Sequence, residues 1–167
     1  DASRAFDVNA HLLLGIAAAE SSFIPRNSPD VGRGLFQITR VPDSMLLQAR
    51  KHLGIEKIAL DNPRHNAFVA AATFKHYLAE MNNDLFLGLL AYNIGPANGG
   101  LRFIMQQYNA NDFITIQPYL QTLPRDYPIR VLSYSLAFQL WQKEGKLLAY
   151  EEGNNAARIQ RIGIPGL

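Results

Sequence analysis

Residues 9–23 have the sequence NAHLLLGIAAAESSF, and this stretch predicts a buried helix that carries one acid near its end. Asn9 is a favourable N-cap, and the apolar residues that follow it recur at helical spacing. The helix should end near Ser22, because the nearby Pro25 cannot continue it. Glu20 follows three alanines, where an ionised carboxylate is costly unless it is paired.

Glu20 has two interpretations at this point. Burial raises the pKa of a carboxyl group toward neutrality, which is what a general acid working near neutral pH requires. Helix geometry alone favours the other interpretation, in which Glu20 turns outward into solvent at the last turn of the helix.

The remaining sequence is helical in its periodicity almost throughout, and no segment shows the alternation of a strand. After a loop over residues 25–35, helices are expected from Asp43 to Gly54, from Asn62-Pro63 to Leu78, from Asp84 to Tyr92, from about Asn98 to Tyr108 and from Pro128 to about Lys143. Residues 109–127 have the composition of a loop. We predict one all-α domain over residues 1–144, followed by a C-terminal tail, residues 145–167, that packs on the domain or extends from it.

Composition excludes several classes of function. The 167 residues are 48% hydrophobic and 18% charged, which fits one folded domain with its own core. The net charge of +2 is too weak to indicate nucleic acid as a partner. There is no cysteine, so disulfides, thiolate nucleophiles and cysteine zinc sites are excluded. The four histidines show no metal-binding spacing, and we expect neither a metal nor a cofactor. No run reaches the roughly 20 apolar residues of a membrane span.

Two further clusters place polar groups beside turns. Residues 32–39, GRGLFQIT, combine glycines that allow close backbone approach to a ligand with Gln37, which offers donors and acceptors to a sugar. Residues 91–96, AYNIGP, put a phenol and an amide where a helix ends. Taken alone, each cluster is better explained by an ordinary turn or helix cap.

Together, the motifs ESSF (20–23), GLFQI (34–38) and AYNIGP (91–96) resemble, in order and spacing, the signature of the soluble lytic transglycosylase domain. That family shows E-S-x-F/W, G-L-M-Q-I/L and A-Y-N-A-G-P. The flanks are similar too, at Val8-Asn9, at Asn62-Pro63 with Asn66, and at Leu123-Pro124. The resemblance covers residues 5–142 and implies a lysozyme-like, all-α single domain.

The resemblance also implies roles for residues in the motifs. Glu20 would be the catalytic acid and base at the floor of a sugar cleft. Phe36 would stand in the wall position that Met usually holds. Gln37 and Tyr92 would line the cleft near Glu20, with the Tyr92 hydroxyl directed toward the carboxyl group or the sugar.

Other substrate contacts are implied less directly. Asn93 would fix the corner that presents the preceding tyrosine, and Ser28 would support the reacting sugar if the alignment has a one-residue gap. The closing segment of the family, E-T-R-x-Y, has no clear counterpart in residues 125–130, RDYPIR. Tyr127 or Arg130 is a candidate to face the cleft, and the alternative is that both are surface or helix-start residues.

The implied activity is that of a peptidoglycan lytic transglycosylase. Such an enzyme cleaves the β-1,4 bond between N-acetylmuramic acid and N-acetylglucosamine without water and leaves 1,6-anhydro ends. The expected partners are peptidoglycan glycan strands. We expect the protein to act as a monomer in the periplasm or cell envelope. The sequence contains no export signal, and a peripheral association with the membrane would need other parts of the parent chain.

Two other functions remain open. A goose-type lysozyme hydrolyses the same bond and needs a second acid to position water, for which Asp30 is the nearest candidate. Asp30 is better explained as a solvated or turn-forming residue in a Pro/Gly-rich loop. The second alternative is an inactive protein that binds peptidoglycan and has kept only the fold.

Overall fold

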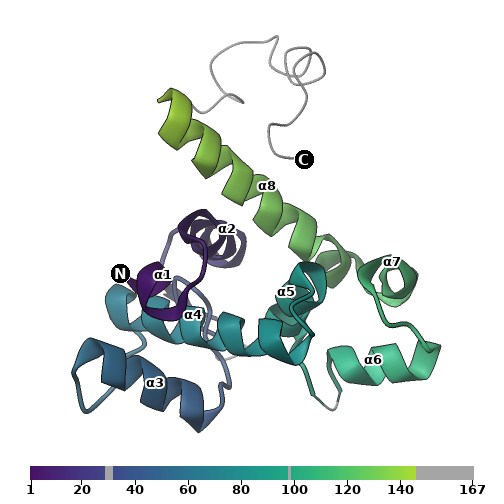
Figure 1. Cartoon of the computed structure of the whole chain (residues 1–167), viewed down its shortest axis with the longest axis horizontal. Helices are drawn as coiled ribbons and strands as arrows, with labels where there is room; N and C mark the ends of the chain where they lie inside the picture. The colour runs from purple at the N-terminus through teal and green to yellow at the C-terminus, as the bar shows by residue number, and fades with distance from the viewer. Residues whose placement is uncertain (29–31, 98, 146–167) are drawn as a thin grey trace.

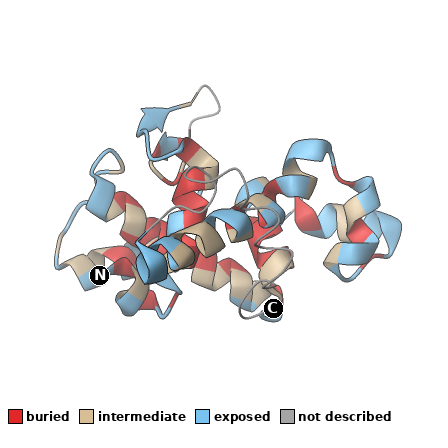
Figure 2. Ribbon diagram, turned by 90° about the horizontal axis from the view of Figure 1, so that it is seen from above, coloured by how far each residue is buried: buried red, intermediate tan, exposed pale blue. Residues whose placement is uncertain are grey.

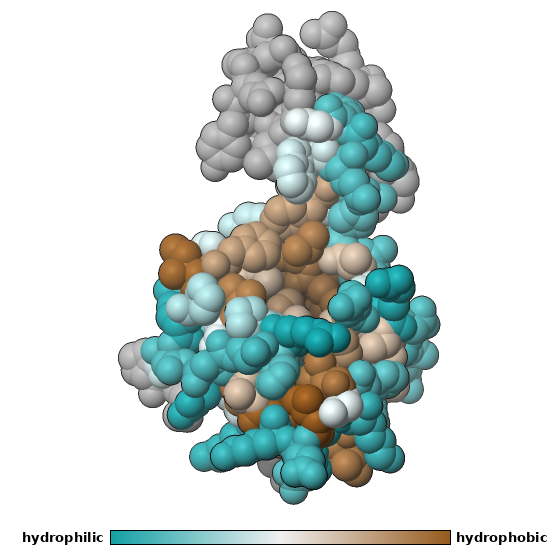
Figure 3. Space-filling model, turned by 90° about the vertical axis from the view of Figure 1, so that its left-hand side faces the viewer, coloured by the Kyte–Doolittle hydropathy of each residue, from teal (hydrophilic) through white to brown (hydrophobic). Residues whose placement is uncertain are grey.

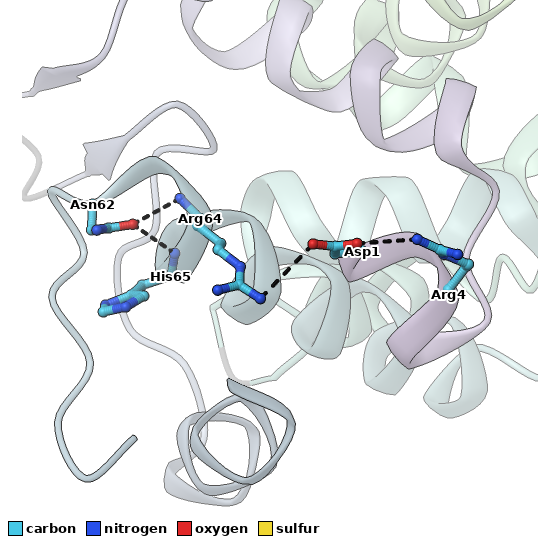
Figure 4. A network of polar contacts seen from close by, with 5 residues as sticks. All are labelled: Asp1, Arg4, Asn62, Arg64 and His65. Carbon is cyan, nitrogen blue, oxygen red and sulfur yellow. Dashed lines mark hydrogen bonds and ion pairs between the residues drawn. The ribbon is translucent and has the colours of Figure 1, made fainter. Parts of the chain in front are cut away.

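The helix α4, Pro63–Glu80, runs through the middle of the computed structural model, which describes residues 1–28, 32–97 and 99–145 (Figure 1). Asn62 caps it as the sequence predicts, because its side-chain oxygen accepts hydrogen bonds from the backbone N–H groups of Arg64 and His65. Figure 4 shows this cap and the guanidinium of Arg64 reaching back to Asp1. The beginning of the chain is therefore tied to the first turn of the central helix.

The other elements of the described residues are mostly short helices. They are α1 (Ala2–Phe6), α2 (Ala10–Ser21), β1 (Arg26–Asn27), β2 (Arg33–Gly34), α3 (Asp43–Leu53), α5 (Leu85–Ile94), α6 (Leu101–Tyr108), α7 (Phe113–Ile116), the 3-10 helix η1 (Gln117–Tyr119) and α8 (Thr122–Glu144).

α8 packs against α2, and these two helices make the most extensive contact between any two elements of the described residues (Figure 1). Gly15 permits this approach, because a Cβ atom at that position would collide with the carbonyl oxygen of Val131. The close crossing brings the first half of α8 to the end of α2, where Glu20 lies.

The interior consists of two clusters of buried apolar side chains. The first surrounds α4 and joins it to α1, α2, α3 and α8, with residues such as Ile16 and Val69 fully buried. The second joins the end of α4 to α5, α6 and α7 around Leu90, Leu101 and Ile116. In Figure 2 the buried residues concentrate in the central helices, whereas α6 and α7 are mostly exposed. The face drawn in Figure 3 is largely polar, with apolar areas between the polar side chains.

The last helix begins earlier than the sequence predicts. We expected it to start at Pro128, but α8 begins at Thr122 and continues through this proline. Pro124 fits the first turn, where a backbone N–H has no helical partner. Pro128 has no backbone N–H, so one hydrogen bond inside the helix is missing. The ring of Pro128 and the side chain of Tyr127 are both buried at this point of the helix.

Two smaller expectations were also wrong. Residues 109–127 are not a loop throughout, since α7 and η1 lie within them and the Asp112 side chain caps α7 by accepting from the Thr115 N–H. The described part of the chain also contains one two-stranded antiparallel hairpin, in which Arg26 pairs with Gly34 and Asn27 with Arg33. A strand of two residues is too short to show alternation in the sequence. The regular structure of the described residues is otherwise helical, as predicted.

Candidate functional site

Glu20 lies in the last turn of α2, immediately before the chain reverses. Ser22 and Phe23 both adopt left-handed backbone conformations, with φ of 52° and 61°, and the Ser22 N–H bonds to the Ala18 carbonyl oxygen. The turn ends the helix before Pro25. It leaves the side chain of Glu20 partly buried rather than directed freely into solvent.

Tyr127 is the direct partner of this carboxylate. Its hydroxyl group donates a hydrogen bond of 2.7 Å to Glu20 Oε1, and its side chain is almost fully buried in α8. The guanidinium of Arg130, one turn further along α8, lies 5.8 Å from the centre of the Tyr127 ring. Of the two candidates in the closing segment, Tyr127 therefore contacts Glu20 and Arg130 contacts Tyr127.

The surroundings of Glu20 shift its pKa in opposing directions. Burial raises the pKa of this carboxyl group and outweighs the other effects. The hydrogen bond from Tyr127 lowers the pKa, as do the positive charges of Arg130 and Arg26. Burial and the charge of Glu20 in turn raise the pKa of the Tyr127 phenol well above its ordinary value, so this hydroxyl remains a donor at neutral pH.

Arg26 ties the hairpin β1–β2 to the end of α2, and Gln37 holds the two strands of the hairpin together. The Arg26 guanidinium donates to the backbone oxygen of Glu20 at 3.4 Å. Gln37, whose φ is 47°, donates its amide hydrogens to the carbonyl oxygens of Arg26 and Gly34, both at 2.8 Å. The amide nitrogen of Gln37 is thus engaged by the protein, and its side-chain oxygen is the atom left for a ligand.

Ser28 lies at the tip of the described part of this hairpin. Its hydroxyl oxygen accepts a hydrogen bond of 3.0 Å from the Gly32 N–H, and its own N–H donates to the Gly32 carbonyl at 2.8 Å. A side chain at Gly32 would crowd both the Ser28 hydroxyl and the Gln37 oxygen. The structure therefore brings Ser28 and Gln37 together on one hairpin.

Phe36 and Tyr92 are joined by a hydrogen bond between the Tyr92 hydroxyl and the Phe36 carbonyl oxygen, 3.0 Å long. The phenol is thus directed to the backbone of the GLFQI segment rather than to the carboxyl group, and burial, followed by the charge of Glu20, raises its pKa. The Phe36 side chain is 5% exposed and packs in the first core cluster. Asn93, the next residue along α5, is exposed.

Asn66 was not among the site residues that the sequence analysis selected. It is 1% exposed on α4, accepts a hydrogen bond from the Phe36 N–H at 2.9 Å and donates one to the Arg33 carbonyl oxygen at 2.9 Å. Its position in the family-like N-P-x-x-N segment was the only sequence signal. Gly15 was missed as well, although a lone glycine inside an apolar helix indicates close packing.

The described residues contain no group of three His, Asp or Glu side chains that could hold a metal ion. Among those same residues, no helix is both long enough and apolar enough to cross a membrane.

Comparison with known proteins places this fold among lysozyme-like domains. The model of the family described as the Transglycosylase SLT domain matches residues 1–115, and the chain belongs to this family. Comparison with curated proteins found no match.

Solved structures of lytic transglycosylases share the fold. An inactive mutant of lytic transglycosylase Slt from Pseudomonas aeruginosa is 19% identical, with a TM-score of 0.66 over 87% of this chain and 24% of that one. The 70 kDa soluble lytic transglycosylase of Escherichia coli is 17% identical, with a TM-score of 0.64 over 92% of this chain and 25% of that one. Its complex with bulgecin A gives the same values. This chain spans about a quarter of the length of these proteins.

Proposed function

We propose that this domain is a peptidoglycan lytic transglycosylase in which Glu20 acts first as an acid and then as a base. The observation that carries the proposal is the partly buried carboxyl group of Glu20, held by the Tyr127 hydroxyl at 2.7 Å. Burial raises the pKa of this carboxyl group, which keeps a larger fraction of it protonated and able to donate. Membership of the Transglycosylase SLT domain family supports the proposal.

The chemistry proceeds in two proton transfers. The Glu20 carboxyl group gives its proton to the oxygen of the β-1,4 bond as that oxygen leaves C1 of N-acetylmuramic acid. The N-acetyl group of this sugar stabilises the positive charge that develops at C1. The C6 hydroxyl oxygen of the same sugar then bonds to C1 and releases its proton to the Glu20 carboxylate. Glu20 returns to its starting state, and the product carries a 1,6-anhydro ring.

This scheme needs only one carboxylate, in contrast to most glycosidases. The charged side chains that act on Glu20 within the described residues are both arginines, and none is a second carboxylate. Nucleophile and electrophile belong to the same sugar, which supplies the proximity that an enzyme otherwise creates by binding two reactants.

The remaining site residues would form the walls of the sugar site. Ser28, Gln37 and Asn93 offer polar groups from the hairpin and from the end of α5. Tyr92 and Phe36 support the GLFQI segment, and Tyr127 orients the acid. We place the catalytic domain in residues 1–144, while residues 146–167 of the proposed tail lie outside the described residues.

Product analysis tests the proposed function. Purified peptidoglycan is incubated with the protein and with Glu20→Gln, and the muropeptides are weighed by mass spectrometry. We expect anhydro products, lighter by one water molecule than hydrolytic products, from the wild type and none from Glu20→Gln. Free reducing ends would instead establish a lysozyme, and binding without release of fragments would establish an inactive binder.

Asp30 provides the second arm of this test. The residue lies outside the described residues, and the prediction from the sequence stands: Asp30→Asn should leave the products anhydro and the rate largely unchanged. A loss of activity as complete as that of Glu20→Gln would contradict the mechanism with one carboxylate.

A further inference from the structure

A cavity opens between α4, the end of α5 and the start of α6, and its volume is about 620 Å³. Arg40 and Pro42 line it from the segment before α3, and Gly95 and Pro96 line it from the end of α5. The wall of the cavity also includes His76, Tyr77 and Glu80 of α4 and Arg102 of α6. We call this cavity the Arg40 pocket.

The charges that line the Arg40 pocket do not balance. Glu80 is shared by two partners, because its Oε1 lies 3.2 Å from His76 Nε2 and its Oε2 lies 3.6 Å from an Arg102 nitrogen. Arg40 is exposed and makes no hydrogen bond or ion pair with another described residue. Two guanidinium groups and one carboxylate therefore line the pocket, and the Arg40 guanidinium keeps its donors unused.

A guanidinium group with free donors favours a planar anion. Its parallel N–H groups match the two oxygens of a carboxylate, and the pair is stronger than a neutral hydrogen bond. Tyr77 and Pro42 supply an apolar wall against which the carbon chain of such a ligand could pack. The pocket is open enough to receive a side group of a polymer.

The chain connects the Arg40 pocket to the site around Glu20 in two places. Arg40 follows Gln37 by three residues, and Gly95-Pro96 follow Tyr92 and Asn93 after one intervening residue, Ile94. Tyr77, on the wall of the pocket, belongs to the second core cluster, against which Tyr92 packs. The segments that would hold a glycan strand at Glu20 therefore continue into the segments that line this pocket.

We propose that the Arg40 pocket binds a carboxylate group carried by the substrate strand, with Arg40 and Arg102 as its ligands. This inference rests on the proposed function and adds that the substrate strand must carry acidic substituents. Two kinds of carboxylate occur on such strands: those of the peptide stems, and the lactyl carboxylates that become free when the stems are removed.

Binding measurements by calorimetry test the pocket with Glu20→Gln protein, which prevents turnover. The ligands are glycan fragments with peptide stems, the same fragments without stems, and neutral N-acetylglucosamine oligomers. Arg40→Gln and Arg102→Gln should weaken binding of an acidic ligand by about threefold to tenfold and leave the neutral oligomer unchanged. Arg4→Gln, an exposed arginine of α1 paired with Asp1, is the matched control and should change none of the three.

The pattern of losses identifies the source of the carboxylate. A loss confined to stem-bearing fragments assigns the pocket to the peptide, and a loss confined to stripped fragments assigns it to the lactyl group. Equal losses for all three ligands, or no loss for either acidic ligand, would overturn the proposal. Anhydro products from Arg40→Gln at an unchanged KM would overturn the pocket while leaving the transglycosylase function intact. Binding that depends on these arginines, together with no cleavage by the wild type, would support the pocket and overturn the transglycosylase function.

Discussion

The Tyr127 hydroxyl donates a hydrogen bond of 2.7 Å to Glu20 Oε1, and this contact joins two residues that lie 107 positions apart. The hydrogen bond stabilises the ionised form of the acid and lowers its pKa, while burial raises it. Tyr127 thus holds the carboxyl group in one orientation and limits how far burial raises the pKa of Glu20.

Tyr127→Phe should raise the pKa of Glu20, because it removes the largest of the effects that lower it. The proposed reaction begins with a protonated carboxyl group, so activity falls as pH rises through this pKa. The alkaline limb of the pH–rate profile should therefore move to higher pH, and kcat should drop about tenfold from lost orientation. A limb that stays in place while kcat falls would make Tyr127 a packing residue only.

Glu20→Gln should make the protein more stable at neutral and alkaline pH. Burial raises the folded-state pKa of Glu20 above its unfolded value, so the folded state binds this proton more tightly. The associated stability is fully present below the unfolded pKa and is lost as pH rises through the folded pKa. Glutamine carries no charge to bury, and its oxygen can still accept from Tyr127. Thermal melts from acidic to alkaline pH should show a Tm gain that grows with pH, and a Tm loss at alkaline pH would contradict this account.

Gly15→Ala tests how α8 is positioned. The added Cβ would meet the Val131 carbonyl oxygen, which belongs to a backbone that cannot move independently of its helix. We expect a loss of about 1–3 kcal/mol in the free energy of unfolding, together with weaker activity because α8 carries Tyr127 away from Glu20. Leu14→Ala, at an exposed position of the same helix, is the control and should change stability by about 0.5 kcal/mol. Equal effects of the two variants would exclude a special role for the close crossing.

The sequence predicted the elements whose signals are local. Asn9, Asn62 and Asp84 each cap the helix expected after them, since a capping side chain bonds to backbone only two or three residues away. It did not predict the partner of Glu20, because a contact across 107 residues depends on how α2 and α8 pack. The start of α8 was missed for a related reason: Pro128 opposes a helix interior locally, whereas the burial of Tyr127 and Pro128 depends on tertiary packing.

The roles suggested for the GLFQI segment were only partly derivable. Gln37 was selected as a sugar ligand because of its amide, but most of the hydrogen-bonding capacity of that amide serves the hairpin. Nothing in the residue type distinguishes these two uses. Only the left-handed backbone at Gln37, which the sequence does not reveal, turns its side chain back toward the Arg26 and Gly34 carbonyl groups.

Asn66→Ala should release the GLFQI segment from α4. The substitution leaves the buried Phe36 N–H and the Arg33 carbonyl oxygen without partners, which costs about 2–4 kcal/mol in the free energy of unfolding. Asn62→Ala, on the same helix, removes a surface cap and should cost about 1 kcal/mol without affecting the segment. Amide hydrogen exchange at residues 34–38 distinguishes the two, since only Asn66→Ala should accelerate it.

Phe36→Met determines whether this side chain supports the core or forms the cleft wall that the family resemblance implies. The Phe36 backbone is fixed on both sides, by Asn66 at its N–H and by Tyr92 at its carbonyl oxygen, and its ring is buried among apolar side chains. Methionine fills a similar volume, so we expect a stability loss below about 1.5 kcal/mol with kcat and KM unchanged. Phe36→Ala should cost about 3–5 kcal/mol, because it leaves a cavity. If Phe36→Met instead raised or lowered turnover while leaving the Tm unchanged, the ring would have to contact substrate, and the wall position would be correct.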